Sequence, residues 1–201
     1  MHKKRRFRYP CVQRKRQKST SETEKIGIAQ RSKEINQRQL FGHWEGDLLM
    51  FTKHNPHLIT LRERKSRYLV AIKSNSRTPQ KTAYTLVKYM KKNWSNIVHS
   101  LTLDNDIAFA HHVTIADAFA APVYFCEPYK SYQKGAIENG NRLLRRYLPK
   151  KSSIEKHTQK DIEMIVSKLN NQPMRCLEYR TPKEVFYEYK ERLNPQGEIR
   201  T

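Results

Sequence analysis

The sequence predicts an α/β fold in which a mixed five-stranded sheet is flanked by helices. Two kinds of segment support this prediction: short apolar or β-branched stretches separated by polar breaks, and longer stretches with apolar residues at helical spacing. The chain has 201 residues, of which 37% are hydrophobic, and its apolar residues are concentrated between residues 44 and 187. We therefore expect one domain of substantial size with extensions at its ends.

Five strands are expected. The connection Arg64-Lys65-Ser66 is short enough for a hairpin, and the first three strands are predicted to be antiparallel. These three are WEGDLLMF (44–51), HLITLRER (57–64) and SRYLVAIKS (66–74). The fourth and fifth are IVHSLTL (97–103) and APVYFCEP (121–128).

Helices are indicated by capping residues that precede apolar residues on one face. Thr78 followed by Pro79 is a typical helix start. Thr181 and Glu184 have the spacing of a capping box at another start. The predicted helices span residues 79–94, 108–120, 134–148, 158–170 and 182–191.

Positive charge extends over the whole chain. Forty Lys and Arg against 19 Asp and Glu give a formal net charge of +21. Residues 1–40 alone hold 13 Lys and Arg against 3 acids, and they are expected to form a flexible basic arm or linker before a core at 41–190 and a C-terminal tail at 191–201. The excess indicates a polyanionic partner, because cations that neutralise phosphates release counterions. A ribosomal-type RNA binder and a merely solubilising surface are the alternatives.

Several classes of protein are excluded by the sequence. No apolar run approaches the ~20 residues of a membrane span, and the basic N-terminus is not followed by the apolar segment of a secretory signal. Cys11, Cys126 and Cys176 stand far apart, which argues against a zinc knuckle and for reduced thiols in the cytoplasm. His111 and His112 have no cysteine at ligand spacing, so we interpret them as solvated or packing residues.

Three acidic residues differ from the exposed helical acids of the rest of the chain. Asp47 lies inside the first apolar strand, where a carboxylate is costly unless it is paired or holds a cation. Asp104 directly follows the fourth strand, and strand ends are where open α/β sheets bind ligands. Glu138 lies on the polar face of the 134–148 helix. The alternative interpretation is that Asp47 is an edge-strand aspartate, Asp104 an ordinary turn aspartate and Glu138 a solvated helix glutamate.

Three carboxylates from two strands and a helix are sufficient ligands for hard cations. Mg²⁺ keeps several waters and takes one or two carboxylates per ion, so these acids could hold two ions of Mg²⁺ or Mn²⁺. Two ions about 3.5–4 Å apart activate an attacking hydroxyl and stabilise the leaving oxygen of a phosphodiester. The sequence offers no persuasive Ser-His-Asp or Cys-His combination, and this chemistry needs no protein nucleophile.

Five segments together resemble one family of proteins. They are GHWEGDLL (42–49), LRERKSRYLVAIK (61–73), LTLDN (101–105), VYFCEPYKSYQKGAIENGNRLLRRYLPK (123–150) and LNNQPMRCLEYRTPKEVF (169–186). In this order they resemble the motifs of the bacterial insertion-sequence transposases of the IS-thirty family, over about residues 40–187. The resemblance implies a ribonuclease-H-like integrase core with a DDE active site.

Motif by motif, the resemblance places the catalytic and metal-binding acids at Asp47, Asp104 and Glu138. It implies metal-dependent DNA cleavage and strand transfer during transposition of an insertion sequence. We expect double-stranded DNA as the partner, as transposon ends and as target, a homo-oligomer in the active complex, and a cytoplasmic, nucleoid-associated location in a bacterium. The residues expected to face DNA are Lys65, Arg67, Lys130, Lys134, Asn139, Asn141, Arg142, Arg145 and Arg146; Tyr129 and Tyr132 could pack or stack near them.

The chain departs from the family pattern at three points. Asp106 stands where the family has a glycine, which would allow an unusual backbone angle, and so adds a carboxylate near the expected metals. Arg142 also stands where glycine is usual. The relatives are longer and begin with a helix-turn-helix region, whereas this chain starts in what resembles the linker after it. Two alternatives therefore stay open: a truncated, catalytically inactive DNA-binding remnant, and a structure-selective nuclease of the same fold.

Overall fold

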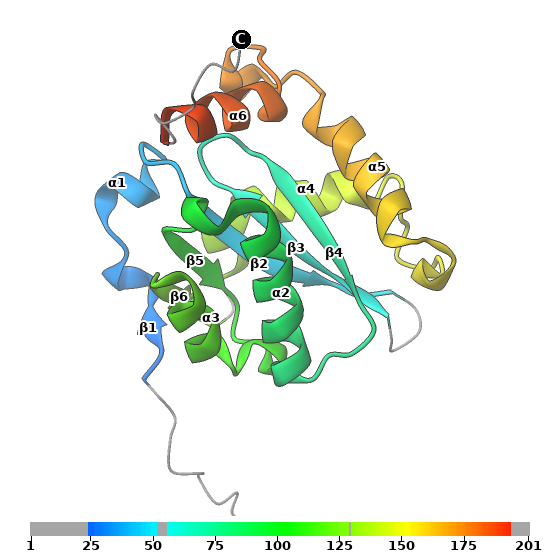
Figure 1. Ribbon diagram of the computed structural model, residues 1–201, viewed down its shortest axis with the longest axis horizontal. Coiled ribbons are helices and arrows are strands. Elements are labelled where there is room, and N and C mark those ends of the chain that lie inside the picture. Colours follow the sequence, from blue (N-terminus) through cyan, green and yellow to red (C-terminus); the bar gives the residue numbers. More distant parts are fainter. Residues whose placement is uncertain (1–23, 52–55, 129, 194–201) are drawn as a thin grey trace, which may run out of the picture.

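A computed structural model describes residues 24–51, 56–128 and 130–193 of the protein. These residues form a six-stranded sheet with helices packed on both faces (Figure 1). The strand order is β1-β6-β5-β2-β3-β4, so β1 and β4 are the edges. The strands are β1 (Ile26–Gly27), β2 (His43–Leu49), β3 (His57–Glu63), β4 (Leu69–Ser74), β5 (Ser100–Leu103) and β6 (Val123–Phe125).

The sheet is mixed, as predicted. The strands β2, β3 and β4 are antiparallel neighbours, whereas β5 runs parallel to β2 and β6 runs parallel to β5. The number of strands is six instead of the expected five, because Ile26 and Gly27 pair in parallel with Tyr124 and Phe125 of β6. A strand of two residues shows no alternation of apolar and polar residues, so no sequence pattern could indicate it.

Four of the five predicted helices begin within one residue of the predicted position, whereas the helix predicted to start at residue 108 starts at His112, because residues 107–109 form a separate 3-10 helix. Thr158 and Asp161 form a capping box at the start of α5, and Thr181 and Glu184 exchange hydrogen bonds before α6. No helix in residues 24–51, 56–128 and 130–193 is both long and apolar enough to cross a membrane. The helices are α1 (Lys33–Asn36), α2 (Pro79–Trp94), α3 (His112–Phe119), α4 (Gly135–Leu144), α5 (Gln159–Asn170) and α6 (Pro182–Leu193), with short 3-10 helices that include η3 (Ile107–Phe109) and η4 (Ser131–Lys134).

Two hydrophobic clusters pack on opposite faces of the sheet. Successive residues of a strand point to opposite faces, and in β3 the side chain of Ile59 joins the cluster under α2 while Leu58 joins the cluster under α4 and α5. Helix α4, which carries Glu138, is therefore fixed on the face opposite α2 (Figure 1). The first cluster includes Trp44, Leu86, Met90, Leu101 and Phe186, and the second includes Leu49, Ile137, Leu144, Ile162 and Leu169.

Part of the predicted basic arm belongs to the fold. Within residues 24–40, β1 extends the sheet and α1 buries Ile35. The buried Arg31 side chain donates to Thr102 Oγ1 on β5 at 2.9 Å and to Asn36 Oδ1 at 2.7 Å. The sequence did not predict these elements because each is too short to be stable alone and depends on contacts with the sheet. The rest of the arm, residues 1–23, lies outside the described residues.

Helix α5 covers the outer edge of β4. The side-chain amide of Asn170 accepts a hydrogen bond from the Leu69 N–H through Oδ1 and donates one to the Leu69 carbonyl through Nδ2, both at 2.9 Å. The Gln159 amide accepts from the Lys73 N–H at 2.8 Å and donates to the Ala71 carbonyl at 3.1 Å. These bonds satisfy backbone groups that an edge strand otherwise leaves open to pairing with another chain.

Candidate active site

Asp47 and Asp104 come together because their strands are parallel neighbours. Glu45 of β2 is in register with Thr102 of β5, so two residues further along each strand the aspartates are level with each other. Their side chains are 23% and 35% exposed. The backbone of Asp47 is held from the next strand by the Thr60 hydroxyl, which donates to its carbonyl at 3.2 Å.

Glu138 lies in the first turn of α4 and lines the same cavity as the two aspartates. This cavity has a volume of about 440 Å³. The fold thus brings the three predicted acids to one hollow, formed where β2 and β5 end beside the start of α4. Its other lining residues are Asn105, Asp106, Cys126, Glu127, Pro128, Lys130 and Lys134.

Lys134 lies between the two aspartates. Its ammonium group is 3.0 Å from Asp47 Oδ1 and 3.3 Å from Asp104 Oδ2, and its side chain is 7% exposed. Burial alone would lower the pKa of Lys134, but the two carboxylates outweigh it and raise the pKa above its ordinary value. Burial raises the pKa of Asp47, Lys134 opposes the rise, and Asp104 adds to it. The prediction that Lys134 faces DNA therefore differs from its observed position, which is inside the acidic site.

Asn141 also serves this site from within the protein. Its side chain is buried, and Nδ2 donates to Asp47 Oδ2 at 2.8 Å. Helical spacing places Asn141 one turn after Glu138, so both side chains lie on the same side of α4. The sequence assigned Asn141 to the DNA-facing surface, whereas the structure shows it orienting a carboxylate.

The side chain of Asp106 makes two structural contacts. Its Oδ1 accepts from the Ala108 N–H at 2.9 Å and caps η3, and its Oδ2 forms an ion pair with Arg77. Its φ of −60° is ordinary, so this position does not require the freedom of a glycine. The Asp106 N–H donates to Asp104 Oδ1 at 3.2 Å. The unusual residue thus supports the loop after β5 and holds Asp104, with its own charge paired.

The donor set fits a hard cation. Two carboxylates already share one cationic group, the ammonium of Lys134, and a third carboxylate lines the same cavity. In the arrangement observed, the described residues contain no group of three or more His, Cys, Asp or Glu that could hold a metal ion. The geometry is therefore a two-carboxylate cation site with Glu138 beside it. Oxygen donors of this kind suit Mg²⁺ or Mn²⁺ better than softer metals.

The other predicted DNA-facing residues of this region are on α4 and near it. Arg142 and Asn139 are exposed and bonded to each other at 3.0 Å. Arg145 is half-buried, donates to the Met50 carbonyl at 2.6 Å and stacks on Phe51. Arg145 thus secures the chain after β2. The remaining ones are exposed: Arg146, Tyr132 and Lys130, which pairs with Glu127; Tyr129 lies outside the described residues.

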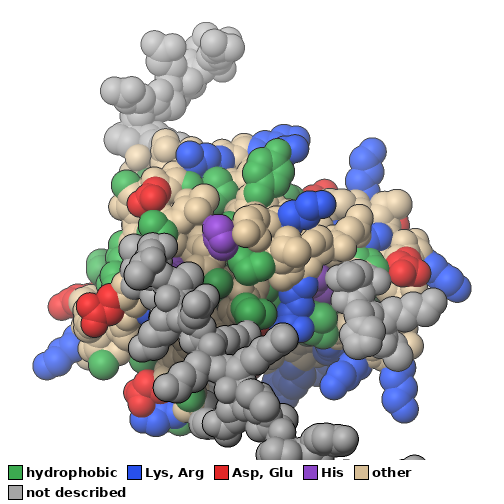
Figure 2. Space-filling model, turned by 90° about the horizontal axis from the view of Figure 1, so that it is seen from below, with side chains coloured by type: hydrophobic (Ala, Val, Ile, Leu, Met, Phe, Trp, Pro, Cys, Tyr) green, Lys and Arg blue, Asp and Glu red, His purple; other side chains and the backbone are tan. Residues whose placement is uncertain are grey.

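Lys65 and Arg67 lie elsewhere, in the turn between β3 and β4. Lys65 donates to the Gln39 carbonyl at 2.6 Å and lies over the ring of Tyr189. Neither residue lines the carboxylate cavity. Basic side chains are not confined to one region: in the view of Figure 2 they stand out around the margin of the face.

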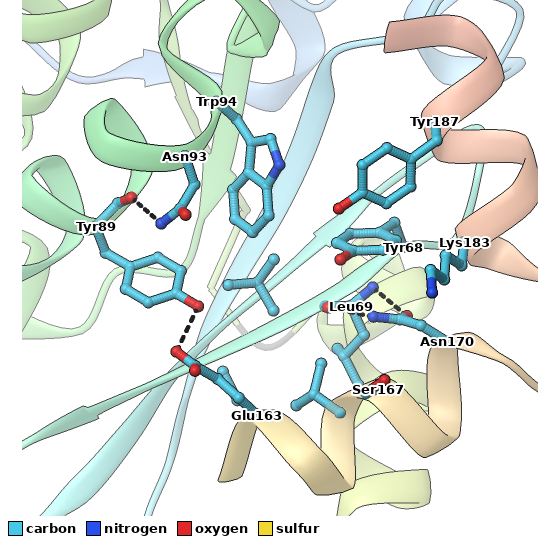
Figure 3. Close-up of a pocket in the computed structure, with 13 residues that line it drawn as sticks. Tyr68, Leu69, Tyr89, Asn93, Trp94, Glu163, Ser167, Asn170, Lys183 and Tyr187 are labelled. Carbon is cyan, nitrogen blue, oxygen red and sulfur yellow. Dashed lines mark hydrogen bonds between the residues drawn. The ribbon is translucent and has the colours of Figure 1, made fainter. Parts of the chain in front are cut away.

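A second cavity, of about 300 Å³, lies between β4, α2, α5 and α6 (Figure 3). Several of its polar groups bond to one another: Tyr89 donates to Glu163 at 3.0 Å, and Asn93 donates to the Tyr89 carbonyl at 2.8 Å. None of the three acids lines this cavity. Its aromatic and amide groups hold helices against the edge of the sheet, so it is a less suitable candidate than the carboxylate cavity.

Glu45 and Arg64 are buried charged residues that the sequence interpretation overlooked. Glu45 is 0% and Arg64 is 4% exposed, and they form an ion pair. Glu45 could have been found by the signal that drew attention to Asp47, because both are acids within the same apolar strand. Glu45 is two positions before Asp47 and therefore lies on the same face of the strand.

Curated proteins similar to this chain include transposases of bacterial insertion sequences. The chain is 37% identical over 159 residues to the transposase InsI of insertion sequence element IS30A from Escherichia coli (strain K12), which covers 79% of this chain and 41% of that protein. It is 33% identical over 162 residues to the transposase of IS4351 from Bacteroides fragilis, covering 81% and 49%. It is 31% identical over 161 residues to the transposase of IS1086 from Cupriavidus metallidurans, covering 80% and 48%. The chain thus spans less than half of each relative, and no protein-family model matches it.

Solved structures with a similar fold include retroviral integrases. The catalytic core domain of BIV integrase has a TM-score of 0.58 at 17% identity, covering 76% of this chain and 98% of that one. A chain of the simian T-cell lymphotropic virus intasome in complex with PP2A regulatory subunit B56 gamma has a TM-score of 0.58 at 17% identity, covering 72% and 54%. This likeness shows the ribonuclease-H-like integrase fold that the resemblance implied. Over about four fifths of its length, the chain is a homologue of insertion-sequence transposases of the IS30 type, and it has the fold of an integrase catalytic core.

Proposed function

We propose that this chain is the catalytic core of a DDE transposase, which cleaves the ends of an insertion sequence and joins them to target DNA. The observation that carries the proposal is the convergence of Asp47 and Asp104 on one cationic group, with Glu138 on the same cavity. Similarity to insertion-sequence transposases supports the reaction class.

Asp47, Asp104 and Glu138 would hold Mg²⁺ or Mn²⁺, as two ions. Bound there, such ions supply an activated hydroxyl and stabilise the leaving oxygen of a phosphodiester. The chain's own contribution is orientation: Asn141 holds Asp47 at 2.8 Å, and the Asp106 N–H holds Asp104 at 3.2 Å. Fixed ligand orientation of this kind supports metal affinity.

The proposed partner is double-stranded DNA, as element end and as target, in a homo-oligomeric complex in the bacterial cytoplasm at the nucleoid. The net charge of +21 supports a polyanionic partner. Exposed Lys130 lines the cavity, exposed Arg142 lies one helical turn after Glu138 on α4, and exposed Arg146 follows the helix; these basic residues would meet a phosphodiester bound along this side of the protein.

The test is a cleavage and strand-transfer assay with Mn²⁺ or Mg²⁺ on DNA that carries the element's ends. Asp104→Asn should abolish both steps, because an amide replaces a charged ligand while the side-chain volume is kept. Asp117→Asn is the matched control, since Asp117 is exposed on α3 and does not line the cavity. Equal activity of Asp104→Asn and wild type would refute the assignment.

Two further outcomes of the same assay identify the rival functions. Metal-dependent cutting without joining would indicate a structure-selective nuclease. Salt-sensitive DNA binding with no cutting at any metal concentration would indicate a non-catalytic DNA-binding remnant.

A further inference from the structure

The Glu45–Arg64 pair is unusual in how completely it is buried. The Glu45 side chain is 1% and the Arg64 side chain 4% exposed, and no other ion pair of the described residues has both side chains so buried. Removing two charges from water costs several kcal/mol per ion, and apolar residues of similar volume are often at least as stable. Stability alone is therefore a weak reason for this pair.

Glu45 also binds the start of helix α4. Its Oε2 accepts from the backbone N–H of Ile137 at 3.0 Å. The first N–H groups of a helix have no partner within the helix, and Lys134, at the N-cap of α4, makes no capping hydrogen bond. The Glu45 carboxylate supplies a cap from a different element, and its negative charge suits the positive end of the helix dipole.

Arg64 extends the same contact to the N-terminal segment. Its Nε donates to the Ile35 carbonyl at 3.3 Å and its NH2 donates to the Asn36 carbonyl at 3.1 Å, at the end of α1. Three elements therefore meet at one buried pair: the strand that carries Asp47, the helix that carries Glu138, and α1.

We propose that Glu45 is a positioning residue that fixes the first turn of α4 against β2, and that Arg64 holds Glu45 in place. Ile137, whose N–H is bound, immediately precedes Glu138, and Glu45 is two residues before Asp47 on the same face of β2. The pair thereby sets the placement of Glu138 relative to Asp47. This inference rests on the proposed function only in giving Glu138 a role in metal binding.

Two variants test the contact in the full chain. In the wild type Arg64 donates to Oε1 of Glu45 and the Ile137 N–H donates to Oε2. Glu45→Gln replaces one of these oxygens by an NH₂ donor, so one of the two contacts is lost. Because this variant leaves a buried guanidinium without its carboxylate and could unfold, the second is the double variant Glu45→Met with Arg64→Met, in which both charges are replaced by apolar groups of similar size.

Glu63→Gln is the matched control. Glu63 is also 0% exposed, and its carboxylate accepts from the Gly42 N–H at 3.1 Å and the Ser66 N–H at 2.6 Å, both of which lie outside α4. The variant Glu63→Gln should lower the free energy of unfolding, because it changes a buried, hydrogen-bonded carboxylate, without affecting the position of Glu138.

Two measurements are needed: the exchange rate of the Ile137 amide proton by NMR, and the affinity for Mn²⁺ by calorimetry. The expected result is faster exchange at Ile137 in the double variant, together with roughly tenfold weaker Mn²⁺ binding, the usual effect of losing a residue that orients a ligand. Glu63→Gln should keep both values near those of the wild type.

Unchanged exchange at Ile137 in the double variant would overturn the inference, and so would an equal loss of Mn²⁺ affinity in Glu63→Gln. Faster exchange with unchanged Mn²⁺ affinity would also overturn it, since α4 would then be released without consequence for the site. Failure of the wild type to bind Mn²⁺ would count against the proposed function instead, and the exchange rate would still decide whether Glu45 holds α4.

Discussion

Replacing Lys134 by methionine should strengthen metal binding. Its ammonium lies 3.0 Å from Asp47 and 3.3 Å from Asp104, so a divalent ion bound by both aspartates must displace it. Even with the dielectric constant of bulk water, charges at these separations attract by about 1.4 and about 1.3 kcal/mol. Burial of the ammonium offsets part of this attraction, and we take about 1.4 kcal/mol as the net amount, which corresponds to about tenfold in affinity.

Calorimetric titration with Mn²⁺ measures the effect directly. Lys134→Met should bind Mn²⁺ about tenfold more tightly than the wild type, and without metal it should unfold at a lower temperature because the two carboxylates then repel each other. Lys130→Met is the control, since Lys130 lines the same cavity but is exposed and paired with Glu127. Equal or weaker Mn²⁺ binding in Lys134→Met would refute the reasoning and would show that the ammonium supports the metal.

Three other predictions concern the surroundings of the site and the fold. Asn141→Leu removes the donor to Asp47 and should weaken Mn²⁺ binding roughly tenfold in the same titration. Burial, with nearby cations, lowers the pKa of His43 from 6.5 to about 4. As the pH falls below 6.5 the unfolded chain therefore takes up the proton before the folded one, so the free energy of unfolding in urea should have its full value above pH 6.5 and fall by about 2 kcal/mol by pH 5. The variant His43→Gln should lack this loss. Asn170→Ala leaves the Leu69 backbone groups at the edge of β4 without partners and should cost about 1–3 kcal/mol in the same assay.

Much of the fold could be predicted because its main elements carry local signals. The alternation and apolar content of residues 44–74 indicated β2, β3 and β4, and Thr158 and Thr181 marked the starts of α5 and α6. The strand β1 and the helix α1 could not be predicted, because segments of two and four residues are too short to show a periodic pattern of apolar residues. Their stability comes from partners distant in the sequence, such as Thr102 for Arg31.

The candidate site also contains residues that could be predicted from the sequence and residues that could not. The acids Asp47, Asp104 and Glu138 were predicted as metal ligands from their settings and by resemblance; the fold places them at one cavity, and their role stays a prediction. The roles of Lys134 and Asn141 could not be read from the chain, because a basic or amide residue on a helix next to an acid is usually at the surface. Only the packing of α4 on the sheet directs these two side chains inward.

The order of residue types along the chain therefore specifies the local structures: an apolar strand that contains Asp47, a strand that ends just before Asp104, and a helix that carries Glu138. The tertiary structure alone decided which charges meet. Parallel pairing of β2 with β5 brings the two aspartates level, Lys134 at the end of η4 lies between them, and the buried Glu45–Arg64 pair joins β2 to α4 and α1. Electrostatic interaction depends on separation in space and on burial, and neither is set by position along the chain.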